Sequence, residues 1–223
     1  MGNIKDSGLL VRILLVTCLM GFSAQAVADS LYQKGIQAFN RNNYQAAVNY
    51  WKQSANKGDP DGINALGTMY TDGLGVKTDK VKAVKLYHLA AKKGSVKAYS
   101  NLGRSYYNGY GIEKNFSLAF QWYKKSADAG NAFGQFGVAL AYEKGRGTEH
   151  NNKLAVKWYK KAIAQGHVGA KINLGEMYRN GWGVRCDLIK ARQLHSEAYR
   201  EGNAEQRETA AHNLGTLSHT ICF

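Results

Sequence analysis

The sequence lacks the motifs by which catalytic and metal-binding sites are usually recognised. Gly-x-Ser-x-Gly, His-Glu-x-x-His, the P-loop and Cys-x-x-Cys are all absent, and the six histidines are scattered along the chain. The Gly-x-Gly pairs that do occur follow helical patterns instead of strands, which makes them turns and not dinucleotide-binding loops. We therefore expect no catalytic residue, no metal site and no cofactor.

Long hydrophobic runs are also missing, apart from a short one near the N-terminus. Residues 13–22 are apolar, Lys5 and Arg12 precede them, and the small residues 26–28 follow. This is the layout of a signal peptide, and we expect it to be cleaved after Ala28. The run is too short to favour a transmembrane helix, although an uncleaved anchor is the alternative. The predicted location is the bacterial periplasm or the extracellular space.

Cysteine is scarce, with three residues in the chain. Cys18 lies in the segment that we expect to be removed, which leaves Cys186 and Cys222 as an even pair. Because exported proteins fold in an oxidising compartment, we predict a disulfide between Cys186 and Cys222. Free thiols and intermolecular pairing are the alternatives.

What the chain has in abundance is a repeat with a step of 36 residues. A Leu-Gly-x-x-Tyr core, a Gly-x-Gly pair and a closing glycine recur in register. The tyrosines of the core are Tyr70, Tyr106, Tyr142 and Tyr178, and the closing glycines are Gly58, Gly94, Gly130, Gly166 and Gly202. So regular a period is the signature of a solenoid, in which stacked repeats bury an apolar face that one repeat cannot bury alone.

Each repeat is predicted to contain two helices. Helix-capping residues recur before both of them, because a cap is needed only where a helix begins. Those before the first helix are Asp59, Ser95, Asn131 and Asn203, with His167 as the one departure; those before the second are Asp79, Asn115, Asn151 and Asp187. Alanines at the equivalent positions 83, 119, 155 and 191 are expected to let the paired helices approach closely.

The predicted organisation follows the repeat boundaries. A signal peptide (1–28) precedes a tetratricopeptide-like N-terminal repeat (29–58), and four full repeats follow, numbered one to four (59–94, 95–130, 131–166 and 167–202). Residues 203–223 are expected to form a terminal helix that caps the array, with Cys222 at its end. The fold class is all-α.

The repeats resemble the Sel1-like repeat, a longer relative of the tetratricopeptide repeat. The resemblance rests on L-G-x-x-Y-x-x-G-x-G-V, then Asx, then K-A-x-x-W-Y-x-K-A, and it covers essentially all of the chain after residue 28. It implies a right-handed α-solenoid of helical hairpins that scaffolds protein–protein contacts. Exported bacterial members act in envelope assemblies, in host interaction, or as immunity proteins against secreted toxic enzymes.

The resemblance also raises an enzymatic alternative. One exported subgroup, described as β-lactamase-like, carries a cysteine pair in nearly every repeat. This chain has no cysteine in full repeats one to three, so we expect a non-enzymatic scaffold and keep a β-lactam hydrolase as a less favoured alternative.

By analogy with tetratricopeptide units, one face of the first helices is the expected partner-binding surface. Repeat three is apolar there while its neighbours are polar. Exposed aromatics of this kind anchor partners, but Phe133 and Phe136 could instead fill the core where Val138-Ala139 replaces the usual Leu-Gly pair. The predicted residues of this face are Arg104, Tyr107, Phe133, Phe136, Leu140, Glu143, Glu176 and Arg179.

Acidic residues are few, 16 against 30 Lys and Arg, and the formal net charge is +14. Lysine pairs such as Lys124-Lys125 and Lys160-Lys161 fall in the last turns of the second helices, where cations favour the negative end of the helix dipole. This placement and the predicted export argue against nucleic acid. An acidic protein partner or an anionic membrane surface remains. We expect a monomer that binds one protein partner in the periplasm, with a secreted host-interaction factor as the alternative.

Overall fold

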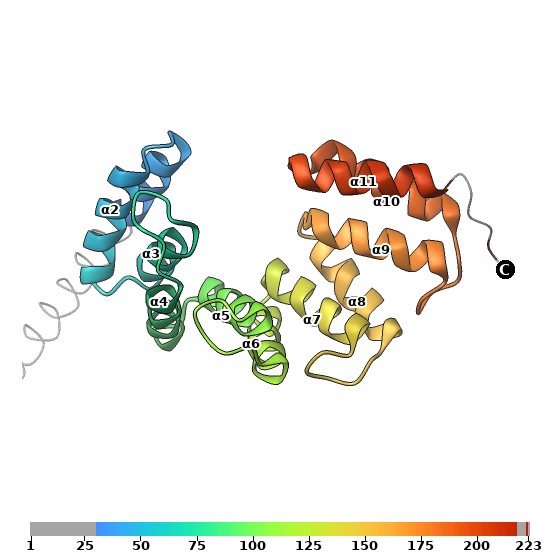
Figure 1. Cartoon of the computed structure of the whole chain (residues 1–223), viewed down its shortest axis with the longest axis horizontal. Coiled ribbons are helices and arrows are strands. Elements are labelled where there is room, and N and C mark those ends of the chain that lie inside the picture. The colour runs from blue at the N-terminus through green and yellow to red at the C-terminus, as the bar shows by residue number, and fades with distance from the viewer. Residues whose placement is uncertain (1–29, 218–221, 223) are drawn as a thin grey trace, which may run out of the picture. The chain divides into compact units, whose positions relative to one another are not determined.

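The computed structural model describes residues 30–217 and 222, and every secondary-structure element in them is a helix (Figure 1). The predicted signal peptide and its cleavage site lie outside the described residues. The helices are residues 30–40, α2 (Tyr44–Asn56), α3 (Pro60–Asp72), α4 (Lys80–Lys92), α5 (Val96–Asn108), α6 (Phe116–Asp128), α7 (Ala132–Lys144), α8 (Asn152–Ile163), α9 (Val168–Asn180), α10 (Leu188–Glu201) and α11 (Ala204–Thr216). The all-α prediction is confirmed.

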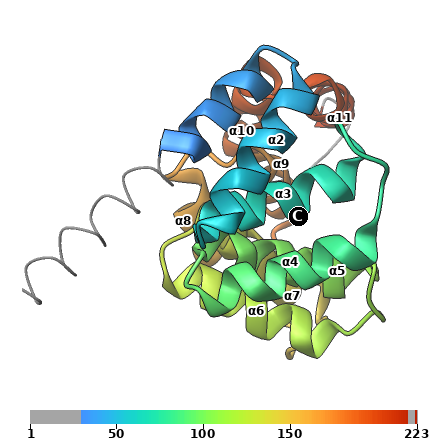
Figure 2. The same cartoon turned by 90° about the vertical axis from the view of Figure 1, so that its left-hand side faces the viewer.

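The chain divides into two compact parts, residues 1–98 and 99–223. In the N-terminal part, α2 packs on α3 and α3 on α4. In the C-terminal part, each helix from α6 to α11 packs on the next, and α11 also contacts α9 (Figures 1 and 2). Packing between consecutive helices, which is the arrangement of a solenoid, confirms the repeat architecture.

Asx side chains start the second helix of each full repeat. An oxygen of Asp79, Asn115, Asn151 and Asp187 accepts a hydrogen bond from the backbone N–H three residues later, at 2.8, 2.9, 3.0 and 2.9 Å respectively. His167, which departs from the Asx pattern before α9, serves the same purpose, because its Nδ1 accepts from the N–H of Ala170 at 3.1 Å. The predicted caps therefore set these helix starts.

One buried ring per repeat packs into the angle between the paired helices. Tyr87, Tyr123, Tyr159 and His195 occupy the same position of successive repeats, and each is at most 9% exposed. Gly175 lies against the ring of His195, where a Cβ would approach the ring carbon to 2.7 Å. The glycine of Leu-Gly is therefore a packing residue that makes room for the ring.

The second glycine of the last Gly-x-Gly pair meets a neighbouring helix directly. Gly183 has φ of 68°, and a Cβ there would overlap the backbone carbonyl of Asn152 at the start of α8. Glycine is required at this position both for its left-handed conformation and for the close approach of two backbones. The turn is thereby held against the preceding repeat.

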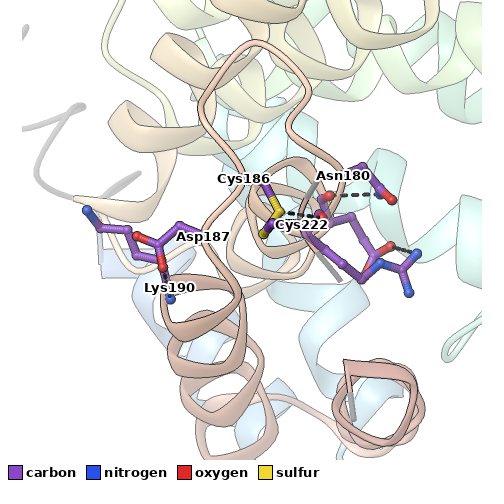
Figure 3. The surroundings of a disulfide bond; sticks show 7 residues. Asn180, Cys186, Asp187, Lys190 and Cys222 are labelled. Carbon is purple, nitrogen blue, oxygen red and sulfur yellow. Dashed lines mark hydrogen bonds and ion pairs between the residues drawn. A yellow bond between two sulfur atoms is a disulfide. The ribbon is translucent and has the colours of Figure 1, made fainter. Parts of the chain in front are cut away.

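A disulfide joins Cys186 to Cys222, with their Cα atoms 5.8 Å apart (Figure 3). Cys186 lies in the turn between α9 and α10, and its sulfur is 3.2 Å from the carbonyl oxygen of Arg179. The sequence predicts Cys222 at the end of the terminal helix, but α11 ends at Thr216 and Cys222 lies beyond it. The bond ties Cys222 to the last full repeat.

Candidate partner-binding face

The predicted face is built from α5, α7 and α9, the first helices of repeats two to four. Six of its eight residues occupy two repeat positions: Arg104, Leu140 and Glu176 at one, and Tyr107, Glu143 and Arg179 at the other. These positions are three residues apart, so they lie on one side of each helix. The surroundings of the side chains differ from repeat to repeat.

Arg104 is exposed, whereas Tyr107 is half-buried beneath Arg146. Arg146 donates a hydrogen bond of 2.6 Å from Nη1 to the Tyr107 hydroxyl, and its guanidinium lies 5.4 Å from the Tyr107 ring centre and 5.2 Å from that of Phe116. These are cation–π distances. Sequence reasoning missed Arg146, although it is the variable residue of the Gly145-x-Gly147 pair and therefore projects from a turn next to α5.

Glu143 belongs to an internal network. Its side chain is 9% exposed, it forms an ion pair with Lys144, and its Oε2 accepts a hydrogen bond of 2.5 Å from the hydroxyl of Tyr159. The amide of Asn173 donates to the same hydroxyl at 2.8 Å. Burial raises the pKa of Tyr159, and the carboxylate of Glu143 raises it further. Tyr159 thus remains a protonated donor, and Glu143 is occupied within the protein.

Glu176 and Arg179 form a second network. They pair with each other at 2.5 Å, and Arg179 Nη1 donates to the hydroxyl of Thr216 in α11 at 2.9 Å. Oε1 of Glu176 lies 3.2 Å from Nε2 of the fully buried His195. The two side chains are about a quarter exposed, 25% and 23%. They connect α9 to α10 and to the terminal helix more than they face solvent.

The two phenylalanines of α7 differ in their exposure to solvent. Phe133 is 65% exposed, whereas Phe136 is half-buried and packs against the cluster around Tyr159. The ring of His167 stacks on Phe136 at 4.4 Å and meets Phe133 edge-on at 5.0 Å. Burial lowers the pKa of His167, which favours its neutral form. Phe133 therefore fits the prediction of a surface aromatic, and Phe136 fits the alternative of a core residue.

The structure distributes the eight predicted residues between surface and interior. Arg104 and Phe133 are open to solvent, Tyr107 is partly covered by Arg146, and Leu140 is half-buried. In the described ranges no three His, Cys, Asp or Glu side chains are grouped so as to hold a metal ion. Within the same residues, no helix has the length and apolar character needed to cross a bilayer.

Comparison with protein families identifies the repeat. The model of the Sel1 repeat matches five consecutive segments, residues 23–59, 60–95, 96–131, 132–167 and 168–203. No curated protein sequence matches the chain significantly.

Solved structures show the same fold. A protective antigen of uropathogenic Escherichia coli strains, with an SLR fold, is 30% identical over 89% of this chain, at a TM-score of 0.66. The chain spans 44% of the length of that antigen. A Sel1 repeat protein from Oxalobacter formigenes is 27% identical, with 86% of each chain covered and a TM-score of 0.63. An immunity protein from Pseudomonas aeruginosa, 16% identical over 86% of this chain and 82% of its own, has a TM-score of 0.55 and shares the fold alone.

Proposed function

Because the chain belongs to the Sel1 repeat family, we propose that it is an exported scaffold that binds a protein partner in the bacterial periplasm. Sel1 repeat proteins are generally non-catalytic scaffolds suited to protein–protein interaction. The proposed task is envelope assembly or immunity against a secreted toxic enzyme.

The exposed ring of Phe133 carries the partner-binding proposal. A phenylalanine that is 65% exposed leaves apolar area in water, and binding a partner recovers that area. The edge-on contact with His167 holds the ring at the start of α7, so little side-chain freedom is lost on binding. Arg104, also exposed, adds a cation on α5, the first helix of the preceding repeat. Aromatic and arginine side chains of this kind are the usual anchors of protein interfaces.

The disulfide supports the periplasmic location. Disulfides persist in oxidising compartments, and Cys186 and Cys222 are the two cysteines that remain after the predicted cleavage. The signal-peptide layout of the first 28 residues points the same way. A secreted factor that acts on host proteins uses the same export route and is the alternative, favoured by the likeness to the E. coli antigen.

The likeness to the P. aeruginosa immunity protein concerns the fold alone, because the identity is 16%, and it does not decide between immunity and envelope assembly. The two tasks differ in the partner that each requires. Immunity requires one toxic enzyme bound tightly at a ratio of one to one. Assembly requires structural components of the envelope.

Capture of the tagged protein from the periplasm of its own cells, with partners identified by mass spectrometry, tests the proposal. We expect one stoichiometric protein to be retained by the wild type and lost with Phe133→Ser. Tyr199→Ser, which removes a 48% exposed aromatic from α10, is the matched control and is expected to retain the partner. Absence of a stoichiometric partner from the wild-type sample would contradict the proposal.

A further inference from the structure

A small apolar pocket opens between α8, α9 and α10. Its volume is about 200 Å³, and Ile163, Leu174, Tyr178 and Leu194 form its apolar lining. Lys160, Lys190 and Gln193 complete the lining, which contains no carboxylate. Pockets for drug-sized ligands measure roughly 300–1,000 Å³, so this one has the size for a single side chain.

In the preceding repeat an indole lies at the corresponding place. Leu194 is the seventh residue after the cap Asp187, and the seventh residue after the cap Asn151 is Trp158. Trp158 packs against the cluster that contains Ala127 and Val138, and Tyr142 packs against the same cluster. These three residues are the repeat equivalents of Ile163, Leu174 and Tyr178, which line the pocket.

The last full repeat therefore has a leucine in its surface groove where the preceding repeat has an indole. Leucine is smaller than tryptophan, and although Ile163 is larger than Ala127, a hollow remains. The last full repeat also keeps the lysine of this groove. In the preceding repeat, Nζ of Lys124 lies 5.8 Å from the ring centre of Trp158, and the repeat equivalent of Lys124 is Lys160. The groove thus keeps the apolar walls and the lysine of an indole site without the indole.

We propose that this pocket, formed by Ile163, Leu174, Tyr178 and Leu194 with Lys160 and Lys190, receives a tryptophan side chain from an acidic segment of the partner protein. The inference rests on the proposed protein-binding function and assigns it a second anchor point. The apolar walls bury the ring, and a lysine above the ring adds a cation–π contact. The two lysines and the formal net charge of +14 select carboxylates beside the tryptophan.

The surroundings have room for the chain that carries the tryptophan. A shallower hollow of about 690 Å³ shares Tyr178 and Lys190 with the pocket and extends to Val184, Leu188 and Cys222. The disulfide between Cys186 and Cys222 (Figure 3) forms part of its lining, so Cys222 borders the path of the bound segment. The residues that flank the tryptophan can lie there next to Lys190.

The test uses the whole exported chain, isotope-labelled, and the capped peptide Asp-Glu-Trp-Asp-Glu as the probe. We expect saturable NMR shifts at the methyl groups of Ile163, Leu174 and Leu194, with binding weakened by added salt. Asp-Glu-Ala-Asp-Glu is expected to bind roughly tenfold or more weakly, as happens when a buried aromatic anchor is removed. Equal binding of the two peptides overturns the proposal. Shifts of these methyl groups by anionic lipid vesicles but not by the peptide also overturn it, in favour of a membrane surface.

Two reciprocal variants distinguish binding in the pocket from nonspecific binding of the peptide. Leu194→Trp supplies the missing indole from within, at a position where the fold already accepts Trp158, and is expected to abolish the shifts. Trp158→Leu is expected to open an equivalent groove one repeat earlier and to produce a second set of shifts, around Val138. Unchanged binding by Leu194→Trp overturns the inference. Replacing Lys160 and Lys190 by alanine is expected to weaken binding several-fold, whereas the same change at Lys92 and Lys153, outside the pocket, leaves it unchanged.

Failure of this inference and failure of the proposed function are distinguishable. If the wild type retains a stoichiometric partner and Leu194→Trp retains it equally, the pocket is not an anchor and the scaffold function stands. If the peptide binds as expected and no partner is retained from the periplasm, the pocket stands as a tryptophan site and the proposed function fails.

Discussion

The hydroxyl of Tyr159 donates a hydrogen bond of 2.5 Å to Oε2 of Glu143, across the angle between α8 and α7. The corresponding pair in repeat one is Tyr87 and Thr71, whose hydroxyl oxygens are 2.9 Å apart. Buried rings at this position therefore use a polar tip to hold the paired helices, and the partner changes from a neutral hydroxyl to a carboxylate. The strength of the contact changes with it, because hydrogen bonds to charged groups are the stronger ones.

Tyr159→Phe is expected to lower the free energy of unfolding by roughly 1–3 kcal/mol, because it leaves Oε2 of the buried Glu143 carboxylate without its donor. Tyr87→Phe is the matched control and is expected to lower it by about 1 kcal/mol, since its partner is neutral. Urea denaturation of both variants measures the difference. A Tyr159→Phe variant no less stable than Tyr87→Phe would contradict this view of the network.

Stability is expected to fall as the pH drops below the ordinary pKa of histidine because of His167. Burial lowers its pKa in the folded protein, so the unfolded chain binds a proton more readily. This contribution to stability is present above about pH 6.5 and is lost as the pH falls from there toward the folded pKa. His167→Asn keeps a capping side chain like Asn131 and Asn203 but removes the titrating ring.

Urea denaturation at pH 7.5 and at pH 5 measures this effect. The wild type is expected to lose more stability between the two values than His167→Asn does. The variant is expected to be less stable than the wild type at both pH values, because it lacks the ring that stacks on Phe136. His88, whose pKa is also lowered by burial, contributes equally to both proteins and cancels in the comparison. An identical loss in wild type and variant would rule out His167 as the source.

Reduction of the disulfide is expected to destabilise the fold. Cys186 and Cys222 are 36 residues apart, and closing a loop of that length restricts the unfolded chain by roughly 3–4 kcal/mol. Cys186→Ser with Cys222→Ser is expected to match the reduced wild type and to be insensitive to reductant. Thermal unfolding with and without reductant measures the loss, and thiol titration of the native protein checks the bond. Two reactive thiols per exported chain before reduction would show that the bond does not form.

Gly183→Ala is expected to lower the free energy of unfolding by roughly 2–5 kcal/mol, because it combines the strain of a left-handed backbone conformation with a steric clash. Its Cβ overlaps the backbone of Asn152, which cannot move without displacing the start of α8. Gly166→Ala separates the two contributions, because Gly166 has φ of 80° but open space around its Cβ. We expect Gly166→Ala to lower the free energy of unfolding by about 1–2 kcal/mol. Equal effects at the two glycines would mean that the turn does not rest against the preceding helix.

The candidate site was only partly predictable. The repeat register correctly brings Arg104, Leu140 and Glu176 to one position of the first helices, but register carries no information on what covers a side chain. Glu143 is occupied because Tyr159 reaches it from the following helix, and Arg146 was missed because a turn residue has no helical period. The different environments of Phe133 and Phe136 depend on the ring of His167, which sequence reasoning considered only as a helix cap.

The sequence by itself determined the fold class, the starts of the helices and the close approach of paired helices. The helix starts and the turns depend on residues near one another in the chain: a capping oxygen with an N–H three residues on, and a glycine at a left-handed turn. The tertiary structure decided which side chains are exposed, which charges are paired and where a groove stays open. Those properties depend on contacts between different helices, such as the space that Leu194 leaves where Trp158 fills it one repeat earlier.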